Sequence, residues 1–160
     1  MAGENATAPA PEVGGPSRKL SVHVIATTKE GTECALASAK RLIGGLDAQV
    51  VLLVPRLTRF SAPFDLSTER AAIIDEHRAL AARVGVHVTV LFCVCHRYDD
   101  VVHQMLGRSS LVIVGGRNRA WWPSREERLV SRLSRKGYPI VFAQVGAERL
   151  LVHPSMEATS

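Results

Sequence analysis

The stretch Leu111-Val112-Ile113-Val114-Gly115-Gly116 decides the fold of this chain. Its first four residues are apolar and mostly β-branched, which is typical of a strand buried on both faces of a parallel sheet. The two glycines are expected to let the backbone turn sharply at the carboxyl end of that strand. An arginine-containing loop, 117–124, comes next and leads into a helix. A buried strand, a glycine turn and a helix N-terminus together predict a site for an anion.

Four other apolar runs predict further strands, and they lie at 20–26, 49–54, 86–95 and 140–145. Between the strands, apolar residues recur at three- and four-residue spacing, which predicts helices at 32–46, 67–84, 99–106 and 125–136. Ser124 and Glu127 have the spacing of a capping box at the start of the last helix. This alternation predicts an α/β fold, a single three-layer α/β/α domain around a five-stranded parallel sheet.

The length of 160 residues indicates one domain. Residues 1–18 are rich in proline, glycine and small residues, a composition that predicts a disordered N-terminal arm. The folded domain is expected to span 19–146. Residues 147–160 are expected to form a tail, of which only 150–152 are apolar enough to dock on the domain.

Charge and cysteine content narrow the class of protein. The net charge is +5, from 20 Lys and Arg against 15 Asp and Glu, and no RNA-binding signature accompanies it, so nucleic acid is not an expected partner. The three cysteines include no C-x-x-C pair, which favours free thiols over a metal site or a disulfide framework. No apolar run approaches the ~20 residues of a membrane span, and the N-terminus has no secretory pattern. A cytoplasmic protein without a membrane span is the expectation.

Three features outside the main pattern each admit two interpretations. One helix face carries Arg125, Arg128, Arg132 and Arg135, and it is either a solvated surface or a patch for RNA, a membrane surface or an acidic partner. Trp121 and Trp122 either stack on a base or contact a partner, or they form a plug packed under the following helix. Cys93 and Cys95 point to the same sheet face, and buried free thiols are the favoured interpretation over a metal or redox pair.

The order of these elements resembles the universal stress protein family. The matching segments are Leu20–Leu46, Val50–Pro55, Leu111–Gly116 and Pro139–Phe142. The resemblance implies the strand order 3-2-1-4-5. It also implies a homodimer that pairs through the last strand, Ile140–Val145.

ATP-binding members of that family carry an Asp after the first strand and the pattern Gly, two residues, Gly, nine residues, Gly and Ser or Thr after the fourth. Here Thr27 stands at the Asp position, Gly115 matches the first glycine and Asn118 falls on the second. The last glycine and its hydroxyl partner fall on Arg128 and Leu129, or on Glu126 and Glu127 when counted back from Pro139. The standard ATP-binding loop is therefore expected to be missing.

The resemblance implies a cytoplasmic regulatory or binding module that is not an enzyme, with at most weak ATP hydrolysis. One alternative is a protein that binds ATP or another adenine nucleotide through an altered arginine-rich phosphate loop. Another is a domain that contacts a transporter or kinase through Trp121 and Trp122. No catalytic residue and no metal ligand is predicted. The candidate nucleotide- or phosphate-binding residues are Thr27, Thr28, Val54, Gly115, Gly116, Arg117, Asn118, Arg119 and Ser124.

Overall fold

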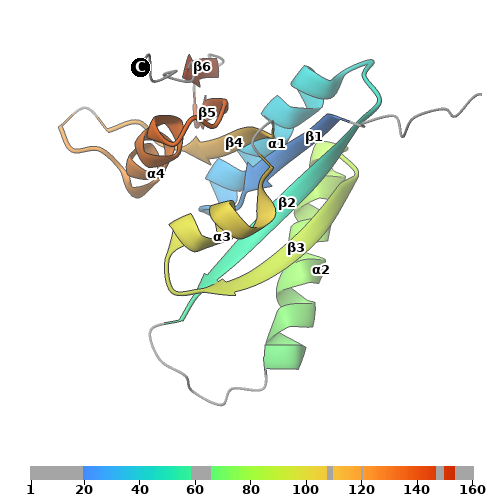
Figure 1. Ribbon diagram of the computed structural model, residues 1–160. Helices are drawn as coiled ribbons and strands as arrows, with labels where there is room; N and C mark the ends of the chain where they lie inside the picture. Colours follow the sequence, from blue (N-terminus) through green and yellow to red (C-terminus); the bar gives the residue numbers. More distant parts are fainter. Residues whose placement is uncertain (1–19, 59–65, 108–109, 120, 147–149, 154–160) are drawn as a thin grey trace, which may run out of the picture.

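The computed structural model describes residues 20–58, 66–107, 110–119, 121–146 and 150–153 (Figure 1). The predicted disordered arm, 1–18, lies outside the described residues, as does most of the predicted tail. The elements in chain order are β1 (Leu20–Ile25), α1 (Lys29–Ile43), β2 (Ala48–Leu57), α2 (Leu66–Val84), β3 (Val88–Cys95), α3 (Tyr98–Met105), β4 (Leu111–Gly116), α4 (Arg125–Arg135), β5 (Ile140–Gln144) and β6 (Leu150–His153).

Five parallel strands form the sheet in the order β3-β2-β1-β4-β5, which confirms the predicted fold class and strand order. β1 and β4 lie in the middle, where Val22, Val24, Val112, Ile113 and Val114 are fully buried. Burial on both faces is the reason why residues 111–114 of β4 are apolar without alternation.

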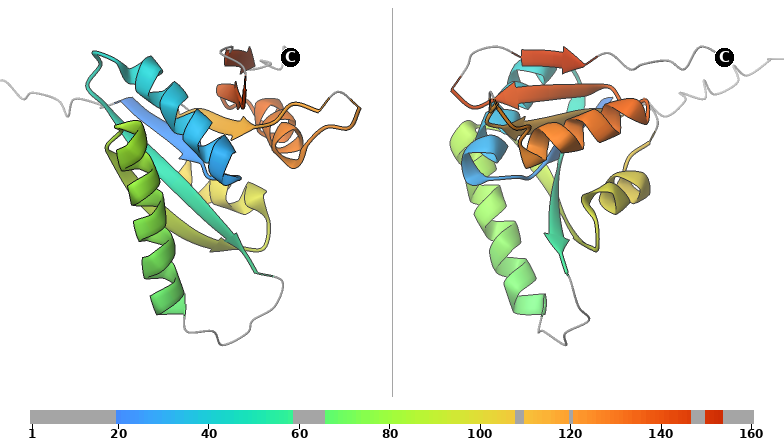
Figure 2. Two further views of the ribbon diagram at one scale, coloured as in Figure 1. Left: turned by 180° about the vertical axis from the view of Figure 1, so that it is seen from behind. Right: turned by 90° about the vertical axis from the view of Figure 1, so that its left-hand side faces the viewer.

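The core has two halves, one on each side of the sheet. α1 and α2 cover the face that carries Val24, Leu52 and Ile113, whereas α3 and α4 cover the face that carries Ile25, Leu53 and Val114 (Figure 2). Neighbouring residues of one strand therefore belong to opposite halves, as the two-residue period of a strand requires. This is the three-layer architecture that the sequence predicts. No helix in the described part of the chain has the length and apolarity needed to cross a bilayer.

One sequence prediction about the strands was wrong, and one strand was not predicted. Gly115 and Gly116 do not form a turn, because both belong to β4 and pair in register with Ala143 and Gln144 of β5. The tail supplies a sixth strand, β6, which pairs antiparallel with β5 from Ile140 opposite His153 to Ala143 opposite Leu150. The Ile140–Val145 edge predicted for a homodimer is thus occupied by this chain's own β6 along its described length, and β6 forms the outer edge of the sheet.

One buried polar side chain interrupts the core on the α3 and α4 side. His23 of β1 lies between Val51 of β2 and Val112 of β4 and is 8% exposed. Its Nδ1 has no hydrogen-bond partner among the described residues. Because burial disfavours the charged imidazolium, it lowers the pKa of His23 below 6.5.

We therefore expect the protein to lose stability as the pH falls below 6.5. In that range the unfolded chain takes up a proton at His23 that the folded protein does not, whereas above 6.5 the imidazole is neutral in both states. The contribution of this one group to the slope is at most about 1.4 kcal/mol per pH unit. Urea unfolding at several pH values should show a shallower slope for His23→Leu. His87→Gln, which removes an exposed histidine, is the matched control, and an unchanged slope in His23→Leu would contradict the prediction.

Candidate functional site

The candidate site lies at the carboxyl ends of β1 and β4, where the chain order in the sheet changes direction. β2 lies on one side of β1 and β4 on the other, so the loops that follow β1 and β4 leave toward opposite faces of the sheet. Such a switch point is where open α/β sheets bind ligands. The sequence prediction placed Thr27 and Gly115 here, and the structure brings them together.

The start of α1 and the end of β4 touch through their main chains. The Thr27 hydroxyl donates a hydrogen bond to the Gly115 carbonyl oxygen, with an Oγ1–O distance of 2.7 Å. A Cβ atom on Gly115 would lie 1.8 Å from the Gly31 carbonyl oxygen, and one on Gly31 would lie 2.6 Å from the Gly115 carbonyl oxygen. Neither position therefore has room for a side chain, and both glycines are explained by packing.

Gly116 is also explained by packing, here against α4. A Cβ atom on Gly116 would lie 2.8 Å from Cβ of Glu126 and 3.4 Å from the Phe142 ring. The Gly116 carbonyl oxygen accepts a hydrogen bond from the Val145 amide at 2.9 Å. Each of the two β4 glycines thus has a neighbour in the folded chain at the place where its missing side chain would be.

The predicted site contains three hydroxyl side chains, and each of them makes a hydrogen bond within the protein. Thr27 bonds to Gly115 as described, and Thr28 caps α1, its Oγ1 accepting from the Gly31 amide at 3.1 Å. Ser124 caps α4, because its Oγ accepts from the Glu127 amide at 3.1 Å while its own amide donates to Glu127 Oε2 at 2.5 Å. The predicted capping box is confirmed. The N-terminus of α4 consequently carries a carboxylate of its own, which reduces its attraction for an external anion.

A cavity of about 370 Å³ opens between the first turn of α1 and the loop that joins β4 to α4. We call it the arginine cavity. Its volume lies within the roughly 300–1,000 Å³ of common ligand sites. It is lined by Thr28, Glu30, Gly116, Arg117, Arg119, Trp122, Pro123, Ser124, Arg125, Glu126 and Arg128. Four arginines face two glutamates in this lining, so the cavity favours an anion bound through guanidinium groups.

Four of the predicted residues do not line the arginine cavity, namely Thr27, Gly115, Val54 and Asn118. Thr27 and Gly115 instead bond to each other as described. Val54 is 6% exposed and packs in the core on the α1 and α2 side. Asn118 is exposed, and it has not adopted the left-handed conformation that would replace a glycine, because no described residue other than glycine has a positive φ.

A second hollow of about 190 Å³ adjoins the arginine cavity and shares Arg125 and Glu126 with it. The Arg125 guanidinium lies 5.7 Å from the centre of the Tyr98 ring, a cation–π distance. Burial raises the pKa of Tyr98 above 10, and the charge of Arg125 opposes that rise. Sequence reasoning missed Tyr98 and Glu30, because neither belongs to a motif. Only the preference for acidic residues in a first helical turn pointed to Glu30.

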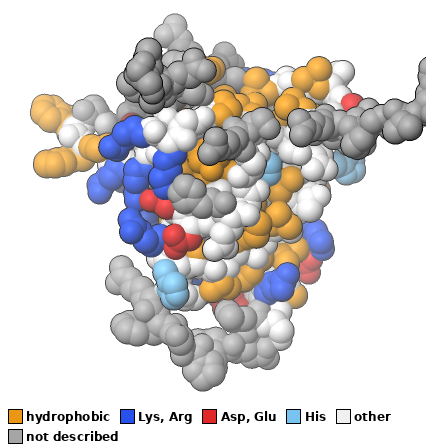
Figure 3. Space-filling model, in the orientation of Figure 1, with side chains coloured by type: hydrophobic (Ala, Val, Ile, Leu, Met, Phe, Trp, Pro, Cys, Tyr) orange, Lys and Arg blue, Asp and Glu red, His pale blue; other side chains and the backbone are white. Residues whose placement is uncertain are grey.

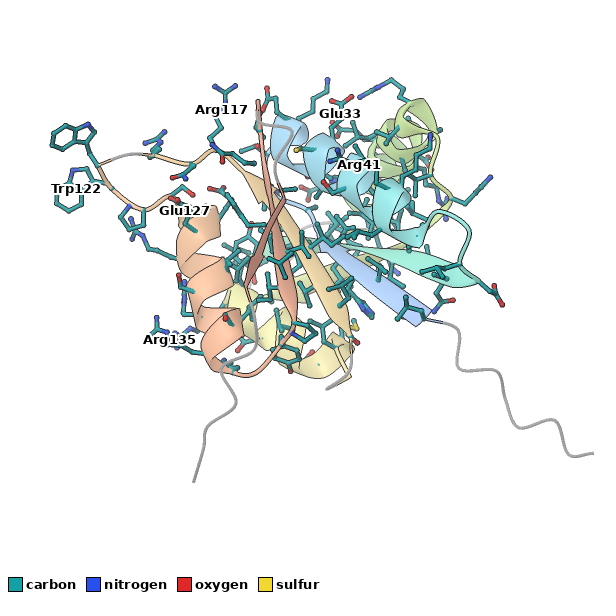
Figure 4. The ribbon with its side chains drawn as sticks, turned by 90° about the horizontal axis from the view of Figure 1, so that it is seen from above. Glu33, Arg41, Arg117, Trp122, Glu127 and Arg135 are labelled. Atoms are coloured by element: carbon teal, nitrogen blue, oxygen red, sulfur yellow. The ribbon has the colours of Figure 1, made fainter. Side chains whose placement is uncertain are left out.

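Trp121 and Trp122 lie at the outer end of the loop that joins β4 to α4. Their side chains are 91% and 78% exposed, so they do not form the plug that the sequence allowed. Figure 4 shows Trp122 directed away from the sheet, beyond the start of α4 where Glu127 lies. The plug interpretation is therefore wrong, and both rings are accessible from outside the protein.

The surroundings of Cys93 and Cys95 are those of buried thiols in the core. Cys93 and Cys95 are each 8% exposed and belong to the same half of the core, on the side of α3 and α4. Burial raises the pKa of both thiols above 9.0, which keeps them protonated and poorly nucleophilic. Within the described ranges, no three His, Cys, Asp or Glu residues group closely enough to hold a metal ion.

Comparison of the fold with solved structures gives three similar proteins. A universal stress protein from Archaeoglobus fulgidus has a TM-score of 0.55 and 12% identity, over 78% of this chain and 93% of that chain. A universal stress protein in complex with cAMP has a TM-score of 0.53 and 12% identity, over 79% and 98%. A protein of the same family from Burkholderia pseudomallei has a TM-score of 0.51 and 16% identity, over 80% and 98%. No protein-family model and no curated protein matches the sequence.

The chain is thus an α/β protein with an open parallel sheet and a crevice at its switch point. Within that class, its fold is that of the universal stress proteins, as the resemblance in the sequence implied.

The contact between Gly31 and Gly115 makes a direct prediction for stability. Gly115→Ala should lower the free energy of unfolding by about 3 kcal/mol or more, because its Cβ meets rigid backbone. Gly44→Ala is the matched control. Its nearest neighbour would be 3.4 Å away and its φ is −52°, so a change within about 0.5 kcal/mol is expected. Urea unfolding of both variants measures the difference, and equal losses would contradict the packing role of Gly115.

Proposed function

We propose that this protein is a universal-stress-protein-like regulatory module of the cytoplasm that acts by binding and association rather than by turnover, without a main-chain grip on ATP. One observation carries the proposal: the β4 glycines, which would have to admit phosphates to the backbone, are in contact with Gly31 and Glu126. Backbone amides hold a phosphate only where the chain leaves them open to it. The carboxylate of Glu127 at the start of α4 adds repulsion to the same region.

The arginine cavity supports a second candidate, a site for an adenine nucleotide that carries a single phosphate. Arg117, Arg119, Arg125 and Arg128 offer planar guanidinium groups that pair with phosphate oxygens two at a time. One of the structurally similar universal stress proteins is in complex with cAMP, so AMP and cAMP are the ligands to test first.

Thermal unfolding with each nucleotide separates the two candidates. The midpoint temperature of unfolding measured with ATP and Mg²⁺ should equal the one measured with Mg²⁺ alone. If the second candidate is correct, AMP or cAMP at 100 times its dissociation constant should add about 2.7 kcal/mol to the free energy of unfolding.

The loss of that stabilisation in Arg117→Gln plus Arg119→Gln, but not in Arg70→Gln plus Arg83→Gln on α2, would assign the binding to the cavity. No response to any nucleotide removes the second candidate. Stabilisation by ATP that survives the Arg117 and Arg119 changes would contradict the first.

The proposal includes association into a homodimer, but β6 now lies on the strand edge through which the dimer was expected to form. A homodimer through Ile140–Val145 requires β5 to expose its backbone groups, and β6 occupies them along its described length. A chain that ends at Gly146 should therefore show more dimer than the full chain at equal concentration in native mass spectrometry. A dimer fraction that is unchanged or smaller would contradict pairing through β5.

A further inference from the structure

The net charge of the chain resides in a single segment. Residues 117–136 hold seven of the 20 Lys and Arg residues and two of the 15 Asp and Glu residues. Thirteen of each sign remain in the rest of the chain, which is therefore neutral overall, and the whole +5 belongs to this stretch. We call it the cationic segment. The space-filling view shows its consequence, because Lys and Arg side chains gather over α4 and the loop before it (Figure 3).

Not every cation in the cationic segment is equally available. Arg132 pairs with Asp99 at 3.3 Å, and Arg125 lies over Tyr98, so these two also tie α4 to the α3 region. Arg117, Arg119 and Arg128 are exposed around the base of the loop that joins β4 to α4 and carries Trp121 and Trp122. Arg128 Nε donates to the Pro123 carbonyl oxygen at 3.3 Å, which holds this arginine next to the loop.

Both tryptophans of the chain stand at the tip of the same loop. Trp121 is 91% exposed and Trp122 is 78% exposed, although tryptophan is on average a highly buried residue. The loop projects from the body of the domain, with Trp122 at its outer end (Figure 4). Two large exposed apolar rings, with arginines behind them, form a projecting surface, although Trp122 also borders the arginine cavity.

We infer that the Trp121-Trp122 loop docks on the surface of a bilayer that contains anionic phospholipids. The two projecting rings can bury their apolar surface only against a partner that deforms around them or has a matching groove. The headgroup region of a bilayer deforms in this way and admits indole rings without a preformed cavity. The positively charged guanidinium groups behind the rings complement the negatively charged lipid phosphates, and they can pair with these phosphates when the rings are inserted. An acidic protein would satisfy the charge but would need a groove shaped for both rings. The inference does not require a nucleotide in the arginine cavity, although both proposals use Arg117 and Arg119.

The test uses the full chain with two kinds of vesicle, phosphatidylcholine alone and phosphatidylcholine mixed with phosphatidylglycerol. We expect co-sedimentation with the mixed vesicles to exceed that with the neutral ones by about tenfold or more at low salt. Because both tryptophans lie in the loop, their fluorescence emission should shift to shorter wavelength only with the mixed vesicles. Equal binding to the two vesicles, or binding without an emission shift, would overturn the inference.

Variants assign the contact to the loop. Arg117→Gln plus Arg119→Gln should reduce binding to the mixed vesicles by about tenfold or more. Arg70→Gln plus Arg83→Gln, which removes the same charge from α2, should leave binding unchanged. Trp121→Ser plus Trp122→Ser should also reduce co-sedimentation, and unchanged far-ultraviolet circular dichroism would show that the fold is intact. Equal loss in both arginine pairs would overturn the inference.

Polyglutamate and single-stranded RNA serve as probes for the other anionic partners. If either shifts the tryptophan emission while the mixed vesicles do not, the surface belongs to a protein or a nucleic acid and the inference is wrong. If the vesicles alone produce the shift, the bilayer is supported over both.

Discussion

The structure depends on one close approach, the contact between the backbones of Gly31 and Gly115. It brings the first turn of α1 directly onto the end of β4, and the hydroxyl of Thr27 fastens the two with a hydrogen bond. α1 can approach β4 so closely only because neither position carries a side chain. This contact determines the shape of the crevice at the switch point, because the start of α1 and the end of β4 both border the arginine cavity.

The same contact decides which atoms remain for chemistry at the site. The main chain of β4 faces other parts of the protein, and the hydroxyls of Thr28 and Ser124 cap their own helices. The charged side chains that line the crevice are four arginines and two glutamates, and Trp122 and Pro123 line it as well. Guanidinium groups adapt to several ligand shapes, whereas a rigid backbone cradle accepts few.

Much of the fold was predictable from sequence because its signals are local. Continuous apolar runs, such as 50–54 and 111–114, indicate buried strands. The capping box of Ser124 and Glu127 is also a local signal, because it lies within four residues. Gly115 and Gly116 were misread because a glycine needed for a turn and one needed for packing look alike until the distant neighbour is known. β6 was reduced to a docking tail because four residues without a strong pattern acquire a strand only by pairing with β5.

Concentration of the net charge in residues 117–136 has a further physical consequence. A neutral body with a positively charged end is a permanent electric dipole, and the dipole points through α4 and the loop before it. In the field near any negatively charged object, such a molecule experiences a torque before it makes contact. Diffusional encounters are therefore biased toward one orientation, with the arginine-bearing end leading and the helices α1 and α2 trailing.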